Sequence, residues 1–165
     1  MKIPSRQRIA ALARRLVLAA VIGGSAWPAH ALSANVVGVL DGDTVDVLAS
    51  PQQRIRCRLH GIDAPEKTQP FGQASKKSLS ELVYRKAIDV ETVGTDPYCR
   101  SICRLRIGTL DVNREQLARG MAWVYRRYTN DSSYLTAEAV ARQQREGLWA
   151  DPDPTPPWKF RREAR

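Results

Sequence analysis

The sequence predicts an α+β fold in which five short strands close into a small barrel and about three helices pack around it. Three observations favour this class. Short alternating or β-branched segments recur along the chain, and turns rich in Gly, Pro or Asp bound them. One amphipathic helical segment separates the third expected strand from the fourth. No internal repeat is visible, which indicates one domain of ordinary size.

The expected strands lie between residues 35 and 107, after a basic and apolar leader. The first is apolar and β-branched, and the second and third alternate across a turn at 49–53, which predicts a hairpin. Pro65 ends the third strand and forces the residue before it into an extended conformation. The five expected strands are 35–40, 44–48, 55–59, 87–92 and 103–107.

An inserted helix is expected to begin at Gln73. Leu79, Leu82 and Val83 share one face of it at i, i+3 and i+4 spacing, so this face is expected to pack on the barrel. Five strands with one inserted helix and further helices at the end of the chain fit a closed barrel of the OB type.

Two later helices and a proline-rich tail complete the expected fold. Asn113 is expected to cap a short helix that ends at Gly120, and a last helix is expected at 132–145. The segment 151–158 contains four prolines and is expected to be neither helix nor central strand. It should therefore lie extended, with Trp158 packed on the body of the protein.

The first 31 residues have the pattern of a secretory signal peptide. A basic start without any acidic residue precedes an apolar run at 16–27, and a small-x-small cleavage motif ends at Ala31. The apolar run is shorter than the roughly 20 residues of a membrane span, although a retained anchor is the alternative. Cleavage would leave an OB-fold domain at 32–150 and the tail at 151–165.

Export has consequences for charge and location. Removing the leader takes away five of the 26 basic residues and no acidic one, so 21 basic and 17 acidic residues give a net charge of +4 instead of +9. A mildly basic protein suits an enzyme that meets a polyanion and must release it. We expect a secreted or periplasmic monomer that has no stable membrane association after processing.

Two motifs place three carboxylates and one arginine within about one hairpin of sequence. The first is DGDT at 41–44, and the second is RLHGIDAPE at 58–66. Arg100 stands in a Tyr-Cys-Arg turn further along the chain. Carboxylates bind hard cations and arginines bind phosphate, and cleavage of a phosphodiester is the leading reaction that needs both at one point.

Each residue type fits a step of that chemistry. Asp43 and Asp63 are hard oxygen ligands for Ca²⁺ or Mg²⁺. Glu66 lies past the bend at Pro65 and could act as the general base through one water. Arg58 and Arg100 offer forked donors to a phosphate. Taken singly, each piece also has a structural explanation, such as a turn, a helix start or a solvated arginine, but their order and spacing favour the site.

The other reactive residue types exclude several classes of site. After processing, His60 is the only histidine, which excludes nucleases that need two histidines and argues against a Ser-His-Asp triad. There is no Cys-x-x-Cys pair or cysteine–histidine cluster, which argues against a structural zinc site. His60 and the tryptophans Trp123, Trp149 and Trp158 are interpreted as packing residues.

From about residue 36 to 162 the chain resembles a staphylococcal-nuclease-type (thermonuclease) domain. The motifs that carry the resemblance are LDGDTV at 40–45, RLHGIDAPE at 58–66, DPYCR at 96–100, VN at 112–113, RGMAWVY at 119–125, GLW at 147–149 and PPW at 156–158. The resemblance implies an OB-fold barrel and a secreted, Ca²⁺-dependent endonuclease that cleaves DNA and RNA and leaves 3′-phosphates. Single strands should be favoured, and Mg²⁺ or Mn²⁺ is the alternative ion.

The resemblance also implies a role for individual residues. The family's site residues fall on the metal ligands Asp43, Asp63 and the Ala64 carbonyl, the catalytic residues Arg58, Glu66 and Arg100, and the nucleotide-pocket tyrosines Tyr98 and Tyr128. Two positions depart from the family pattern. Pro97 stands where the best-known member has a phosphate-contacting lysine, and Cys99 stands where a glycine is usual, at a position that favours positive φ.

The cysteines suggest a compensation for that second departure. Cys57 precedes Arg58 and Cys99 precedes Arg100, so two arginines that converge on one phosphate would bring these cysteines together. This predicts a Cys57–Cys99 bridge. The pairings of either residue with Cys103, or three unpaired thiols, are the alternatives.

Two competing hypotheses remain open at this point. The first is an exported nucleic-acid-binding module on the same OB fold without catalysis, although such modules lack some of the arginines or the glutamate that are present here. The second is an exported interaction or envelope protein, for which Ca²⁺ would have no effect.

Overall fold

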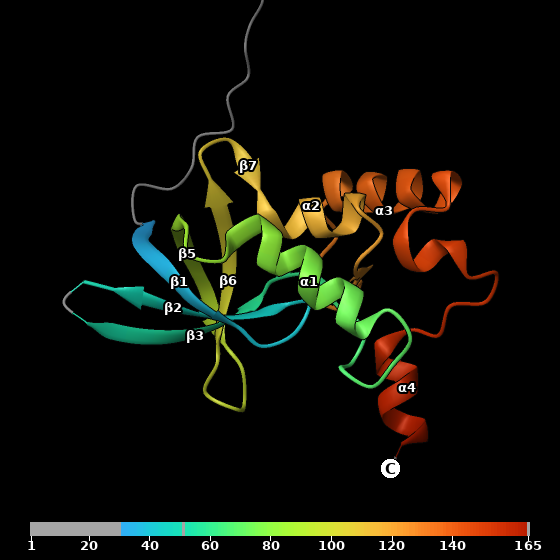
Figure 1. The fold of residues 1–165 in the computed structure, drawn as a ribbon, viewed down its shortest axis with the longest axis horizontal. Coiled ribbons are helices and arrows are strands. Elements are labelled where there is room, and N and C mark those ends of the chain that lie inside the picture. Colours follow the sequence, from blue (N-terminus) through green and yellow to red (C-terminus); the bar gives the residue numbers. More distant parts are fainter. Residues whose placement is uncertain (1–30, 51, 165) are drawn as a thin grey trace, which may run out of the picture.

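The computed structural model describes residues 31–50 and 52–164. The expected signal peptide therefore lies outside the described residues, apart from its last position. Figure 1 shows the strands on one side of the molecule and α2 and α3 on the other, with α1 running across the barrel and α4 at the C-terminal end. Within the described part of the chain, no helix has the length and apolar character to cross a membrane.

Five strands close into a barrel, as the sequence predicts. The main sheet has the order β3-β2-β1-β5-β6-β7, and β3 also pairs in parallel with β6, which closes it. A separate pair joins β4 to β8. The strands are β1 Leu32–Val39, β2 Thr44–Ala49, β3 Gln53–Leu59, β4 Ile62–Asp63, β5 Ala87–Thr95, β6 Ser101–Ile107, β7 Leu110–Asp111 and β8 Trp123–Val124.

The helices confirm the α+β class. The described residues form four α-helices and one 3₁₀ helix, where the sequence predicted about three helices. They are α1 Gly72–Val83, α2 Val112–Ala118, α3 Ser132–Gln144, the 3₁₀ helix η1 Gly147–Ala150, and α4 Pro157–Glu163. The buried face of α1 includes Leu79, Leu82 and Val83, the three residues expected there. These side chains join the barrel core, while Trp123, Trp149 and Leu148 form a second buried cluster.

The expectation that Asn113 caps α2 is wrong. Asp111 is the cap, and its carboxylate accepts a hydrogen bond from the backbone N–H of Arg114 at 2.9 Å. The buried Asn113 side chain instead accepts from Leu105 N and donates to the His60 carbonyl, both at 3.1 Å. A buried amide that pairs with two separate segments joins them, so Asn113 ties α2 to the barrel.

The expectation that the tail avoids helix is wrong from Pro157 onward. Pro157 starts α4, because proline's missing N–H costs nothing in the first turn of a helix. Trp158 lies edge-to-face on Trp123 with ring centroids 5.6 Å apart. The Gln69 amide also donates to the Thr155 carbonyl at 2.6 Å. The tail is therefore fastened beside the loop that carries Glu66.

Candidate active site

The turn between β1 and β2 buries the carboxylate of Asp43. The side chain of Asp41 accepts a hydrogen bond from Asp43 N at 3.0 Å, which fixes the turn. Gly42 packs so closely against Ser75 and Ala64 that a Cβ at this position would collide with both. Glycine is therefore required for α1 and the 64–66 segment to approach the turn, and Asp43 is left almost wholly buried.

Arg58 connects the two aspartates of the predicted site. It stands opposite Thr44 in the β2–β3 register. Its Nη1 donates to Asp43 Oδ1 and its Nη2 donates to Asp63 Oδ1, both at 2.6 Å. Asp63 is fully buried and the Arg58 side chain is 17% exposed. One planar guanidinium thus holds both carboxylates, a geometry that an ammonium group would not reproduce.

The charge balance at Asp43 favours a further cation. Burial, together with the nearby Asp41 and Asp63, raises the pKa of Asp43 to about 7, although Arg58 and the hydrogen bond from Ala64 act in the opposite direction. Burial opposes the charge of Arg58, yet Asp43 and Asp63 together raise the pKa of this arginine above its usual range. A second positive charge would therefore stabilise the ionised carboxylates.

Ala64 meets Asp43 through its backbone. Its N–H donates to Asp43 Oδ2 at 2.7 Å, so the segment that follows Asp63 is held against the β1–β2 turn. Glu66 follows in a turn in which its own N–H donates to Gln69 Oε1 at 3.1 Å. Its carboxylate lies at the rim of the site, 40% exposed, which leaves it accessible to water.

A residue that the sequence analysis missed completes the cluster. Arg161 of α4 donates from Nη1 to Glu66 Oε1 at 2.7 Å and from Nη2 to Asp63 Oδ2 at 2.8 Å. The hydrogen bonds with Asp63 and Glu66 raise the pKa of Arg161 above its usual range. The only sequence signal was a basic run after Pro156-Pro157-Trp158, and nothing in it indicates a partner so distant along the chain.

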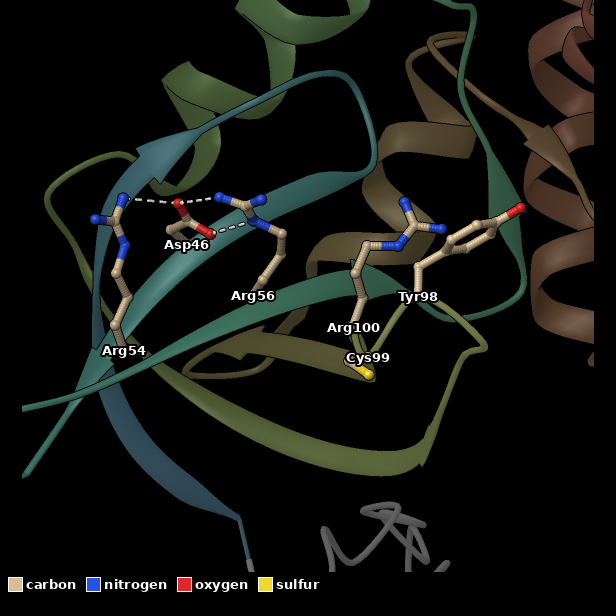
Figure 2. Close-up of a pocket in the computed structure, with 6 residues that line it drawn as sticks. All are labelled: Asp46, Arg54, Arg56, Tyr98, Cys99 and Arg100. Carbon is tan, nitrogen blue, oxygen red and sulfur yellow. Dashed lines mark hydrogen bonds and ion pairs between the residues drawn. The ribbon is translucent and has the colours of Figure 1, made fainter.

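Arg100 lies in a neighbouring group rather than among these carboxylates. Its Nε and Nη2 contact Asp96 Oδ2 at 2.7 and 2.6 Å. Figure 2 shows Arg100 and Tyr98 beside Arg56, in an open pocket next to β3. The structure thus brings Asp43, Asp63, Arg58 and Glu66 together, and Arg100 contacts none of these carboxylates.

The two predicted nucleotide-pocket tyrosines are on the surface. Tyr98 is 77% exposed and its ring lies 5.7 Å from the Arg100 guanidinium carbon. Tyr128 is 59% exposed and lies edge-to-face on Tyr125. Both rings are thus available to a ligand, but they belong to different loops.

The turn before Arg100 holds Cys99 in a conformation that favours glycine. Cys99 has φ of +60°, the left-handed conformation that the usual glycine would adopt easily. The Asp96 carboxylate accepts from the backbone N–H groups of both Tyr98 and Arg100 at 2.9 Å, which holds the turn in place.

The structure does not contain the predicted Cys57–Cys99 bridge. All three thiols are free, and Cys99 is exposed while Cys57 and Cys103 are buried. The Cys57 side chain points into the barrel, where hydrogen bonding with Cys103 and burial raise its pKa. Alternation along β3 explains this, because Arg58 faces the carboxylates and its neighbour must therefore face the core.

The donor set is chemically suited to a hard cation. Asp43 and Asp63 supply buried carboxylate oxygens and Glu66 supplies one at the rim. Among the described residues, no three Asp, Glu, His or Cys side chains are grouped closely enough to hold an ion. Arg58 and Arg161 contact the carboxylates instead, so three negative charges face two positive ones and a cation would compensate the remainder.

Comparison with known proteins identifies the family. The family model described as staphylococcal nuclease homologue matches residues 56–151. The chain belongs to the staphylococcal nuclease family. The matched region includes Arg58, Asp63 and Glu66 but ends before α4, so the family model does not cover Arg161.

Curated relatives of this staphylococcal nuclease homologue support the assignment. A protein named uncharacterized endonuclease from Haemophilus influenzae is 43% identical over 129 residues, which cover 78% of this chain and 72% of the relative. A micrococcal nuclease from Shigella flexneri is 39% identical over 162 residues and covers 91% of this chain and 92% of the relative. Protein ParB from Escherichia coli is 39% identical over 160 residues, with 87% and 86% coverage.

Proposed function

We propose that this protein is an exported, metal-dependent endonuclease that hydrolyses phosphodiester bonds of DNA and RNA. The observation that carries the proposal is the forked contact of Arg58 with Asp43 and Asp63, next to Glu66, on a staphylococcal nuclease fold. The relatives named endonuclease and micrococcal nuclease support it. Export is proposed from the leader pattern at 1–31, with a secreted or periplasmic monomer as the active form.

The acidic residues have two proposed tasks. Asp43, Asp63 and the Ala64 carbonyl would hold the ion, with Ca²⁺ as the proposed choice because all three donors are hard oxygens. When bound, a divalent ion polarises a phosphoryl oxygen and lowers the pKa of nearby water. Glu66, which is accessible at the rim, would accept a proton from the attacking water.

The arginines would stabilise the negative charge that develops on phosphate. Arg58 already presents a fixed fork at the carboxylates and would donate to a phosphoryl oxygen from this position. Arg100 would have to exchange its contact with Asp96 for the phosphate, so its part in the site requires a change in that ion pair. Tyr98 and Tyr128 are exposed enough to stack on unpaired bases, which favours single strands. Cleavage to 3′-phosphates is proposed from the family resemblance alone.

The direct test is cleavage of denatured DNA and of RNA by the processed protein, with Ca²⁺ and with a chelator. We expect both substrates to be cut only in the presence of the ion, and double-stranded DNA to be cut more slowly. End-group analysis of the products should find 3′-phosphates. Cleavage that continues in chelator would overturn the metal-dependent mechanism.

A further inference from the structure

The C-terminal helix α4 and the loop after β8 enclose an open groove of about 490 Å³. Five residues line it: Tyr125, Arg127, Trp158, Arg161 and Arg162. We refer to it as the α4 groove. Neither Tyr98 nor Tyr128 lines it, although the Tyr128 ring adjoins it through the edge-to-face contact with Tyr125. Three of its five lining residues also lie beyond residue 151, where the match to the family model ends.

Two independent connections place the α4 groove next to the catalytic carboxylates. Arg161 is shared, because it lines the groove and also contacts Asp63 and Glu66. The β4–β8 pairing is the other connection, since it sets Asp63 opposite Trp123 and is followed by a hydrogen bond from Tyr125 N to Gly61 O at 2.9 Å. A strand bound at the carboxylates would therefore extend into this groove.

The aromatic lining contains a stacked pair of rings that a base can extend. The rings of Tyr125 and Trp158 are parallel within 2°, with centroids 5.6 Å apart. Both residues are half-buried, so each ring keeps part of its surface accessible. Trp158 is also held by its edge-to-face contact with Trp123. A rigid aromatic surface of this kind stacks on any base, which suits a nuclease with little sequence preference.

Two of the three arginines that line the α4 groove are available to a ligand. Arg127 and Arg162 are exposed, and neither forms an ion pair with any residue that the structure describes. By contrast, Arg54 and Arg56 are both paired with Asp46, and Arg100 is paired with Asp96. Unpaired guanidinium groups beside aromatic rings fit a phosphate next to a stacked base.

We propose that the α4 groove is a subsite for the nucleotide that adjoins the scissile phosphate of a single-stranded substrate. The base extends the Tyr125–Trp158 stack on a ring face that stays accessible, and its phosphate contacts Arg127 and Arg162. The proposal rests on the proposed nuclease function and extends it, because it gives a part in substrate binding to α4, which carries none of the site residues that the family resemblance implies.

The first test measures binding without cleavage. Fluorescence anisotropy of a labelled oligothymidylate is recorded in chelator for the processed protein, for an Arg127→Gln/Arg162→Gln variant and for an Arg85→Gln/Arg114→Gln variant. The Arg85→Gln/Arg114→Gln variant is the control, because it has the same charge change at positions that do not line the groove. We expect the groove variant to bind about ten-fold more weakly with a salt dependence reduced by about two charges, and the control to stay within about two-fold. Equal losses in both variants would overturn the proposal.

The second test locates the base. An oligonucleotide that carries iodouracil is irradiated on the unmodified protein, and the crosslinked peptides are identified by mass spectrometry. Crosslinks at Tyr125 or Trp158 are expected. The absence of crosslinks at both Tyr125 and Trp158, with Tyr98 crosslinked, would show that the base does not reach the groove.

The same proteins separate this proposal from the nuclease function itself. If the processed protein cleaves denatured DNA in Ca²⁺ while the groove variant binds and cleaves as well as the control, the subsite is wrong and the nuclease function stands. If the processed protein binds oligothymidylate through the groove without cleaving DNA, the subsite stands and the nuclease function is wrong. Absence of both binding and cleavage would reject both.

Discussion

Arg161 and Glu66 are 95 residues apart in the sequence, yet Arg161 Nη1 lies 2.7 Å from Glu66 Oε1. The same guanidinium contacts both oxygens of Asp63, at 3.2 and 2.8 Å. The last helix of the chain therefore covers two of the three carboxylates on which the proposed chemistry depends. A divalent ion and this guanidinium would compete for the same oxygens.

Arg161→Gln should separate the stabilising contacts of this arginine from its competition with the ion. Without the ion, the variant should lose about 1–2 kcal/mol of unfolding free energy in urea, because hydrogen bonds to charged groups are lost. Its affinity for Ca²⁺, measured by calorimetry, should rise about ten-fold because the oxygens of Asp63 and Glu66 become free. Arg162→Gln, one position later and without an ion pair, is the matched control. Unchanged Ca²⁺ affinity in Arg161→Gln would show that the two cations do not compete.

Arg58→Lys tests whether cleavage requires the two-pronged contact of the Arg58 guanidinium with Asp43 and Asp63. A lysine keeps the charge but cannot bridge Asp43 and Asp63, so we expect about a hundred-fold loss of turnover in a protein that still folds. The rate of cleavage of denatured DNA at saturating Ca²⁺ is the measurement. Arg114→Lys, exposed on α2 and outside the carboxylate cluster, should keep most of its activity. Equal rates for both variants would refute the need for the fork.

The site residues that could be predicted from sequence are those joined by local geometry. Asp43 and Arg58 come from the two strands of one hairpin, whose register sets Thr44 opposite Arg58. Asp63 follows after one tight turn. Short spacing of this kind limits the possible arrangements, which is why two motifs were enough to indicate the cluster.

The site residues that were not predicted depend on contacts between segments that are far apart in the sequence. Arg161 reaches the site only because Trp158 packs on Trp123 and Gln69 holds the tail at Thr155, and neither contact has a sequence signature. The prolines of the tail predicted an extended chain, although Pro157 is compatible with a helix start. Arg100 was expected to meet Arg58 at one phosphate, but it pairs with Asp96 of its own turn, and the DPYCR pattern does not reveal this contact.

Asp46 should give the protein a measurable acid sensitivity. Hydrogen bonds from Arg56 and Arg54 lower the pKa of Asp46, although its burial opposes this. The stabilisation is therefore complete above the unfolded-state pKa near 3.9 and is lost as the pH falls through the lower folded-state pKa. Asp46→Asn should cost about 1–2 kcal/mol at neutral pH and nothing near pH 2, as measured by urea denaturation. A difference that does not depend on pH would contradict this assignment.

Cys99→Gly should stabilise the protein. A non-glycine residue in the left-handed region costs roughly 1–2 kcal/mol, and Cys99 has φ of +60°. We expect a gain of about 1 kcal/mol in unfolding free energy, partly offset by the greater freedom of glycine in the unfolded chain. Cys99→Ala removes the thiol but keeps the Cβ, so it should show no gain. Equal stabilities of the two variants would indicate that the turn carries no strain.

The most direct measurement is the rate at which Glu66→Gln cleaves denatured DNA at saturating Ca²⁺, beside Glu81→Gln as a control. Glu81 is exposed on α1 and pairs only weakly with Lys77, at 3.8 Å. Loss of a general base should slow Glu66→Gln by about 10²- to 10⁴-fold, while Glu81→Gln keeps the full rate. Cleavage by a folded Glu66→Gln variant at the rate of the control would contradict the proposed active site.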